Sequence, residues 1–174
     1  MTNKMFLCGF MASGKTTVGK ALSKKLNIAF FDTDAEIEKS LNFNIMELFL
    51  NKQEGYFRKL ETKILNSFKK TNLKNKSSFI VSTGGGMFTH NKNIKIAQKI
   101  GIIIFLDVSL RNCILRSSAK KRPILTTKTY EEIEIIYKNR RQKYLKFANI
   151  VVQNNKTIDL ATSEIIKKLN FTSF

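Results

Sequence analysis

The feature that most constrains this chain is a glycine-rich segment near its beginning. Residues 9–16 read Gly-Phe-Met-Ala-Ser-Gly-Lys-Thr, a match to G-x-x-x-x-G-K-T, and they directly follow the apolar run 5–8. A strand that leads through such a turn into a helix aims backbone N–H groups, the helix dipole and a lysine at one phosphate. A chance turn is the alternative, but the motif lies in the first strand–helix unit in the correct frame. It therefore predicts binding of a nucleoside triphosphate.

The length and the cysteine content limit the class of protein. With 174 residues, we expect one domain over residues 1–174. Cys8 and Cys113 show no C-x-x-C spacing, which favours a reducing compartment over a disulfide scaffold. The first apolar run begins at residue 5, and no apolar stretch approaches the roughly 20 residues of a membrane span. We therefore expect a soluble, cytoplasmic protein without a signal peptide or a membrane segment.

The charge is strongly positive, with 31 Lys and Arg residues against 13 Asp and Glu residues and a net charge of +18. Such an excess can indicate a nucleic-acid surface. The basic residues are scattered, however, and no aromatic residues alternate with them in a base-stacking pattern. We expect no specific nucleic-acid partner, and we attribute the charge to compositional bias that still attracts anionic substrates.

Strand-like and helix-like patterns alternate along the chain, which predicts an α/β domain with a mainly parallel sheet. The expected strands are residues 4–9, 28–31, 79–82, 102–107 and 150–153. The expected helices are residues 13–26, a helix capped by Thr33, about 44–51, 55–70, 93–100, a helix capped by Ser109, a helix from Thr129 to about residue 147, and 160–170. Capping boxes are expected at Thr33 with Glu36 and at Thr129 with Glu132.

Two aspartates follow the second expected strand. Asp32 and Asp34 lie at its carboxyl end, where open α/β sheets bind ligands. One carboxylate can hold Mg²⁺ or its water shell, and the other can accept a proton from an attacking hydroxyl group. The alternative is that Asp34 only complements the dipole of the next helix, as we expect for Glu36.

Two further motifs are candidates for substrate contacts. Arg58 and Glu61 share a helix face, so the glutamate can orient the guanidinium group as a clamp for a carboxylate; a surface ion pair is the alternative. The third expected strand ends in three glycines, whose bare backbone a ligand can approach, unless they form only a flexible turn. Ser82, just before them, is a candidate for the magnesium water shell.

Residues 117–127 contain basic side chains and the single proline, and we interpret them as a mobile lid. Transfer of a phosphoryl group needs cationic stabilisation and exclusion of water, which a basic lid provides. Arg116 and Arg122 lie at this segment. On the next helix, Arg140 or Arg141 is expected to face the same cleft, although a solvated basic face is an equal alternative for either one alone.

Together, the motifs G-F-M-A-S-G-K-T-T, F-D-T-D, F-R-K-L-E, T-G-G-G, K-R-P-I-L and R-R-x-K-Y resemble those of shikimate kinases in order and spacing, over nearly the whole chain. The resemblance implies a P-loop, nucleoside-monophosphate-kinase-like fold with a five-stranded parallel sheet in the order 2-3-1-4-5, flanked by helices. It also implies a phosphate loop at 9–17, a substrate-binding region at about 32–61 and a mobile lid. The implied reaction is ATP- and Mg²⁺-dependent phosphorylation of the 3-hydroxyl group of shikimate, in the pathway to chorismate and aromatic amino acids.

The resemblance also implies roles for individual residues. The catalytic residues would be Lys15, Asp34 and Arg122. Shikimate would be bound by Asp34, Arg58, Gly84, Gly85, Gly86 and Arg140. The nucleotide would be bound by Ala12, Ser13, Gly14, Lys15, Thr16, Thr17, Arg116, Arg122 and Asn154. The metal ligands would be Thr16 and Asp32.

This sequence departs from the family pattern in two places. The late helix lacks the usual proline between arginine and tyrosine, so the choice of Arg140 over Arg141 depends on counting back from Tyr144. The loop 153–156 also lacks a proline, and we expect adenine contacts there from the backbone and from Asn154 or Asn155.

Two other interpretations remain: a related small-molecule kinase of the gluconate type, and a non-catalytic, nucleotide-binding regulatory module. Arg58 and Arg140 favour a carboxylate substrate over an uncharged polyol. A regulatory module needs neither the Asp32–Asp34 pair nor a lid arginine. We therefore expect a monomeric enzyme whose partners are shikimate and ATP.

Overall fold

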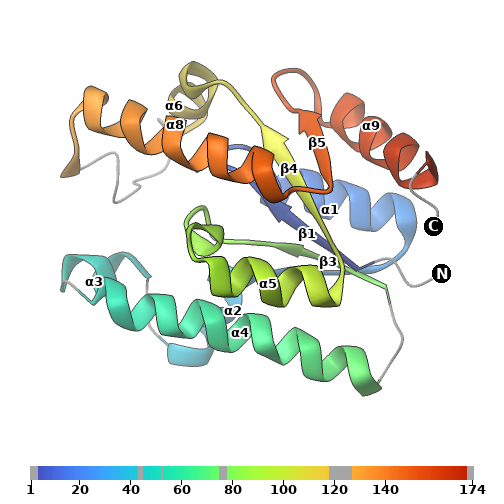
Figure 1. Cartoon of the computed structure of the whole chain (residues 1–174), viewed down its shortest axis with the longest axis horizontal. Helices are drawn as coiled ribbons and strands as arrows, with labels where there is room; N and C mark the ends of the chain where they lie inside the picture. Colours follow the sequence, from blue (N-terminus) through green and yellow to red (C-terminus); the bar gives the residue numbers. More distant parts are fainter. Residues whose placement is uncertain (1–3, 43–44, 52, 75–77, 118–126, 172–174) are drawn as a thin grey trace.

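The computed structural model describes residues 4–42, 45–51, 53–74, 78–117 and 127–171 (Figure 1). The strands are β1 (Lys4–Cys8), β2 (Ala29–Asp32), β3 (Phe79–Ser82), β4 (Ile102–Asp107) and β5 (Ile150–Gln153). The helices are α1 (Lys15–Leu26), α2 (Thr33–Leu41), α3 (Ile45–Leu50), α4 (Glu54–Lys74), η1 (Met87–Thr89), α5 (Asn91–Ile100), α6 (Leu110–Ser117), α8 (Tyr130–Phe147) and α9 (Ile158–Phe171).

The five strands form one parallel sheet in the order β2-β3-β1-β4-β5, which confirms the predicted fold. The central strand, β1, pairs with β3 on one side and with β4 on the other; Phe6, for example, lies in register with Val81 and Ile103. The chain order reverses at this strand, and ligands of open α/β sheets bind at such a point, beyond the carboxyl ends of the strands. The glycine-rich segment begins there.

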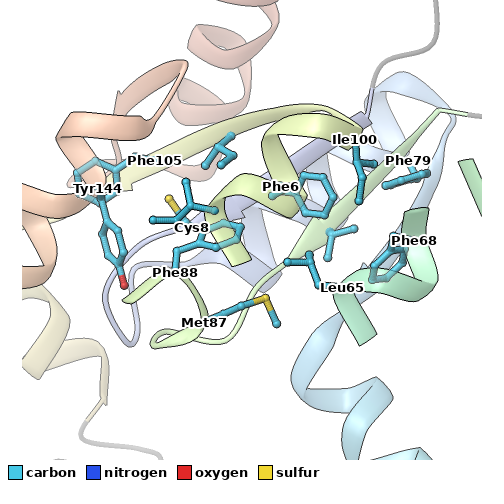
Figure 2. Packing of buried hydrophobic residues seen from close by; sticks show 14 residues of the cluster. Phe6, Cys8, Leu65, Phe68, Phe79, Met87, Phe88, Ile100, Phe105 and Tyr144 are labelled. Atoms are coloured by element: carbon cyan, nitrogen blue, oxygen red, sulfur yellow. The ribbon is translucent and has the colours of Figure 1, made fainter. Parts of the chain in front are cut away.

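Alternate residues of β1 face two separate hydrophobic clusters. Phe6 and Cys8 pack against residues of α4, α5 and α8, and Figure 2 shows Phe6 beside the rings of Phe68 and Phe79. Met5 and Leu7 face the opposite cluster, which α1 and α9 complete. Helices therefore cover both faces of the sheet, as a parallel sheet requires. The core fixes the position of the strand ends on which the site is built.

Three predicted helix caps have different outcomes. The caps at Ser109 and at Thr129 with Glu132 are confirmed, the second as a complete capping box. The capping box predicted for Thr33 and Glu36 is wrong, because β2 runs one residue further than expected. Asp32 therefore caps α2, and the buried Thr33 hydroxyl accepts a hydrogen bond from the Gly84 N–H at 2.9 Å. Thr33 thus ties the start of α2 to the glycine turn.

Both cysteines are buried thiols without a disulfide partner. Burial raises the pKa of Cys8 well above its ordinary value and raises the pKa of Cys113 to about 11. Both side chains are therefore protonated at neutral pH, as expected for packing residues. Among the described helices, none combines the length and the apolar character that a membrane crossing requires.

Candidate active site

The glycine-rich segment forms a tight turn between β1 and α1. Ala12 and Gly14 have φ values of 55° and 87°, in the left-handed region that favours glycine at position 14. A Cβ atom on Gly14 would lie 2.7 Å from the Asn154 side-chain nitrogen, so the packing also requires glycine here. The turn delivers backbone N–H groups and the N-terminus of α1 to one cavity, an arrangement suited to binding phosphate.

The Lys15 side chain folds back over this turn. Its Nζ atom donates to the carbonyl oxygens of Gly9 at 3.1 Å and Phe10 at 3.0 Å, and only 9% of the residue is exposed. The backbone carbonyls of the glycine-rich loop therefore hold the Lys15 ammonium group against the loop. This is the position from which a lysine can contact nucleotide phosphates.

Oxygen atoms that suit Mg²⁺ gather beside the loop. The Thr16 hydroxyl donates to Asp32 Oδ2 at 2.7 Å and lies 3.4 Å from the Ser82 hydroxyl. The other carboxylate oxygen of Asp32 accepts from the Asp34 N–H at 3.1 Å, which fixes the orientation of the carboxylate. Hydroxyl and carboxylate oxygens are the donors that Mg²⁺ takes from proteins when phosphates and water complete its shell. The residues present therefore fit the ion.

Two cavities meet at this end of the sheet. The loop cavity, about 300 Å³, is lined by Met11, Ala12, Gly14, Lys15, Thr16, Thr17, Asp32, Asp34, Ser82, Thr83, Gly85 and Arg116. The arginine cavity, about 260 Å³, is lined by Met11, Asp34, Ile45, Phe49, Glu54, Phe57, Arg58, Glu61, Gly84, Gly85, Gly86, Thr127, Lys128, Ile136 and Arg140. Asp34 lines both, together with Met11 and Gly85. A group bound in one cavity can therefore reach a group bound in the other past Asp34.

Arg58 is held rigidly in the wall of the arginine cavity. Its two terminal nitrogens pair with Glu61 at 2.9 Å and with Glu54 at 2.7 Å. The guanidinium carbon lies 5.4 Å from the ring centre of Phe57 and 6.0 Å from that of Phe49. Burial alone would lower the pKa of Arg58, but the two glutamates raise it above its ordinary value. The cavity therefore presents a fixed positive charge.

The two arginines of α8 point to different places. Arg140 lines the arginine cavity, and its Nη1 atom donates to the Gly85 carbonyl at 3.2 Å. Burial, and then the charge of Arg58, lower the pKa of Arg140. Arg141 instead makes a bidentate ion pair with Asp107 at 2.9 and 2.7 Å, outside that cavity. The geometry therefore separates the two candidates and puts Arg140 beside Arg58. In Figure 1, α8 lies across from α3 and the start of α4, whose residues also line the cavity.

Two acidic side chains converge on the glycine turn. A Cβ atom on Gly84 would lie 2.6 Å from Asp34 Oδ1 and 3.0 Å from Glu61 Oε1, so only glycine admits both. Glu61 is fully buried, and this burial raises its pKa to about 7; Arg58 opposes the shift and Asp34 adds to it. The floor of the arginine cavity therefore carries one carboxyl group that titrates near neutral pH.

Some residues of the cavity wall were not predicted from the sequence. Glu54 lies four residues before Arg58, and the helical i,i+4 spacing could have indicated it. Phe49 and Phe57 had no distinguishing signal in a chain with 14 phenylalanines. Tyr144 is buried and is not part of the lining itself; its hydroxyl points away from the other labelled side chains (Figure 2) and donates to the Gly85 carbonyl at 2.7 Å. This hydrogen bond fixes the position of the glycine turn, residues 84–86.

Three of the residues that were predicted to bind the nucleotide have different outcomes. Arg116, at the end of α6, lines the loop cavity with an exposed side chain. The Asn154 side chain is buried and donates to the Ser13 carbonyl, on the reverse side of the phosphate loop. Arg122 and most of the expected lid, residues 118–126, lie outside the described residues.

The fold and the two joined cavities define a P-loop kinase of small molecules. A family model described as shikimate kinase matches residues 11–170, and the chain belongs to this family. The shikimate kinase of Aquifex aeolicus (strain VF5) is 35% identical over 167 residues, which cover 95% of each chain.

Solved structures agree with this family. The shikimate kinase of Acinetobacter baumannii, in complex with shikimate, superposes with a TM-score of 0.87 at 29% identity, covering 100% of this chain and 97% of that one. A gluconokinase from Sinorhizobium meliloti superposes with a TM-score of 0.58 at 12% identity, covering 99% and 98%. This second likeness is evidence of a shared fold alone.

Proposed function

We propose that this chain transfers the γ-phosphoryl group of ATP to the 3-hydroxyl group of shikimate, producing shikimate 3-phosphate and ADP on the path to chorismate and aromatic amino acids. The observation that carries the proposal is the position of Asp34, in the wall of both the loop cavity and the arginine cavity. A carboxylate at that junction is within reach of a hydroxyl group in one cavity and the phosphates in the other. Family membership supports the same reaction.

In this proposal, the arginine cavity binds the acid. Arg58 and Arg140 bind the carboxylate of shikimate, since guanidinium groups match two carboxylate oxygens. The Arg58 fork is already oriented by Glu61 and Glu54, so little side-chain entropy is lost on binding. The backbone of Gly84, Gly85 and Gly86 borders the ring of the bound acid, with Asp34 at its hydroxyl groups.

The transfer step needs a base and a stabilised phosphoryl group. Asp34 accepts the proton of the 3-hydroxyl group. The hydroxyl oxygen forms a bond to the γ-phosphorus, while the bond between the γ-phosphorus and the β-phosphate oxygen breaks. Lys15 neutralises the charge that develops on the transferred group, together with the N–H groups of the loop. The carbonyls of Gly9 and Phe10 hold the cation beside the loop cavity, next to the proposed position of the phosphates.

The remaining nucleotide contacts are proposed in the same way. Ala12, Ser13, Gly14 and Thr17 surround the phosphates. Arg116 lies toward the adenine. Thr16 and Asp32 hold Mg²⁺, which screens the phosphate charge when bound. Arg122, outside the described residues, is proposed to contact the transferred phosphoryl group.

We further propose that the chain acts as a single-domain monomer in the cytoplasm. The match of the family model to residues 11–170 supports a single domain. The two buried thiols without a disulfide support a reducing compartment.

A coupled assay of ADP release tests the proposed reaction. Purified protein, ATP and Mg²⁺ are combined with shikimate, with gluconate or with no acceptor. We expect ADP release that depends on shikimate and is absent with gluconate. Turnover with gluconate would favour the related sugar-acid kinase, and nucleotide binding without turnover on any acceptor would favour a regulatory module.

A further inference from the structure

Asn154 connects the end of the sheet to the phosphate loop. It follows β5 directly, lies 141 residues from Ser13 in the chain and is only 4% exposed. Its side-chain Nδ2 atom donates to the Ser13 carbonyl oxygen at 2.8 Å, and its backbone N–H donates to the Asp107 carbonyl at 3.0 Å. The residue is therefore anchored to β4 by its backbone and holds the loop with its side chain.

This hydrogen bond fixes the orientation of one peptide group. In a trans peptide, the C=O of one residue and the N–H of the next point in opposite directions within one plane. Asn154 pulls the Ser13 carbonyl toward the reverse side of the loop, so the Gly14 N–H points the other way. Gly14 lines the loop cavity, and Asn154 is not among the residues of its lining, so an N–H that points away from Asn154 is available to this cavity.

The loop needs such an external constraint because of its glycine. Gly14 has a φ of 87°, and glycine visits positive and negative φ about equally, so the Ser13–Gly14 peptide has little intrinsic preference for this orientation. Lys15 stabilises the loop through the carbonyls of Gly9 and Phe10 and the Ser13 hydroxyl. The Ser13 carbonyl is instead held by Asn154.

We propose that Asn154 is a positioning residue: it orients the Gly14 N–H for binding of the nucleotide phosphates through its hydrogen bond to the Ser13 carbonyl. This role differs from the adenine contact expected from the sequence. It rests on the proposed function, because it assumes that the loop cavity binds a nucleotide. It assigns to the β5–α9 connection a part in phosphate binding.

Two variants and one matched control test the proposal. Asn154→Ala removes the hydrogen bond, and Asn154→Asp keeps the size of the side chain but turns an oxygen toward the Ser13 carbonyl. The control is Asn149→Ala, at the opposite end of β5, where the Asn149 side chain accepts a hydrogen bond from the Ile103 N–H, also at 2.8 Å. The control variant loses a side-chain hydrogen bond of the same length, but this hydrogen bond does not involve the phosphate loop.

The measurements are ADP affinity by titration calorimetry, the KM values of both substrates, and Tm. For Asn154→Ala we expect ADP affinity to fall and the KM for ATP to rise by roughly 5- to 20-fold, the scale of one lost hydrogen bond. The KM for shikimate is expected to stay within about twofold, since a lost nucleotide contact does not reach the arginine cavity. Asn154→Asp is expected to lose more ADP affinity than Asn154→Ala, because its carboxylate repels both the Ser13 oxygen and the phosphates.

The contrary results are distinct. Unchanged ADP affinity in both Asn154 variants, or equal weakening of ADP in Asn149→Ala, would overturn the positioning role. An equal loss of affinity for ATP and for shikimate would show that Asn154 is a general packing residue instead. A wild-type protein that binds no ADP would overturn the proposed function, and this inference with it. If Asn154→Ala does not fold, the isosteric Asn154→Asp decides the question.

Discussion

The loop cavity and the arginine cavity are neighbours, but they are built in different ways. Most of the loop cavity comes from one short stretch, residues 11–17, and from the ends of β2 and β3, and it uses backbone groups and short polar side chains. The arginine cavity collects long side chains from α3, α4 and α8, which lie as far apart in the chain as Ile45 and Arg140. Local backbone geometry therefore creates the first cavity, and tertiary packing creates the second.

This difference separates the expected effects of substitutions. In the loop cavity, Lys15 is proposed to act on a charge that grows during the reaction, so its loss should lower the catalytic rate. In the arginine cavity, Arg58 is proposed to bind a carboxylate whose charge is the same before and during the reaction, so its loss should weaken binding. The predictions below test this separation, beginning with the largest expected effect.

Lys15→Ala should lower kcat by about 10³-fold or more, because a positioned cation in a low-dielectric site stabilises the transferred phosphoryl group directly. The fold should survive, since the core beneath the loop is unchanged. The check is steady-state kinetics with circular dichroism, and Lys20→Ala, on the exposed side of the same helix, is the control. Near-normal turnover in Lys15→Ala would contradict the assignment of the loop cavity to phosphoryl transfer.

The sequence was informative about the loop cavity because this cavity depends on local order. The motif at 9–16 fixes the glycines, the lysine and the hydroxyl within one turn, and the fold order then brings Asp32 to Thr16 at 2.7 Å. The one error nearby, the cap at Thr33, arose from a strand end that extends a single residue further than its pattern indicates. Element boundaries depend on such small differences in hydrogen bonding.

The arginine cavity was only partly predictable. Arg140 and Arg141 are neighbours on one helix, about 100° apart around its axis, and only their spacing from Tyr144 distinguishes them in the sequence. Their separation depends on Asp107, at the end of β4, which attracts Arg141 away from the cavity. The aromatic wall of Phe49 and Phe57 likewise exists only because α3 packs on α4. Contacts of this kind cannot be predicted from local sequence, because they depend on how the helices and strands pack in three dimensions.

Arg58→Lys should raise the KM for shikimate by roughly 10-fold and leave the KM for ATP within about twofold. Lysine keeps the charge but loses the planar fork that pairs with Glu61 and Glu54 and that matches a carboxylate. Steady-state kinetics with each substrate varied in turn is the measurement. Arg141→Lys, which weakens a bidentate pair outside the cavity, is the control. Similar changes in both KM values for Arg58→Lys would remove the distinction between the two cavities.

The smallest effect concerns the pH dependence of the arginine cavity. Burial raises the pKa of Glu61 to about 7, with Arg58 opposing the shift. Lowering the pH from about 8 to about 6 should therefore protonate Glu61 and weaken its hold on Arg58. The KM for shikimate is expected to rise by roughly 2- to 5-fold over this range, as one hydrogen bond loses its charged acceptor. The KM for ATP should not follow, and Glu61→Gln should flatten the shikimate profile.

Protein stability should respond to the same proton in the opposite direction. The folded-state pKa of Glu61 lies above the ordinary value of 4.5, so the folded protein binds more protons than the unfolded chain between these two values. The stabilisation that this proton gives is complete below about pH 4.5 and is lost as the pH rises through about 7. Relative to Glu61→Gln, the wild-type Tm should therefore decrease from about pH 5 to about pH 8, while shikimate binding improves. A Tm difference between the wild type and Glu61→Gln that stays constant from about pH 5 to about pH 8 would show that Arg58 keeps Glu61 ionised throughout. The arginine cavity would then be as insensitive to pH as the fixed charge of the loop cavity.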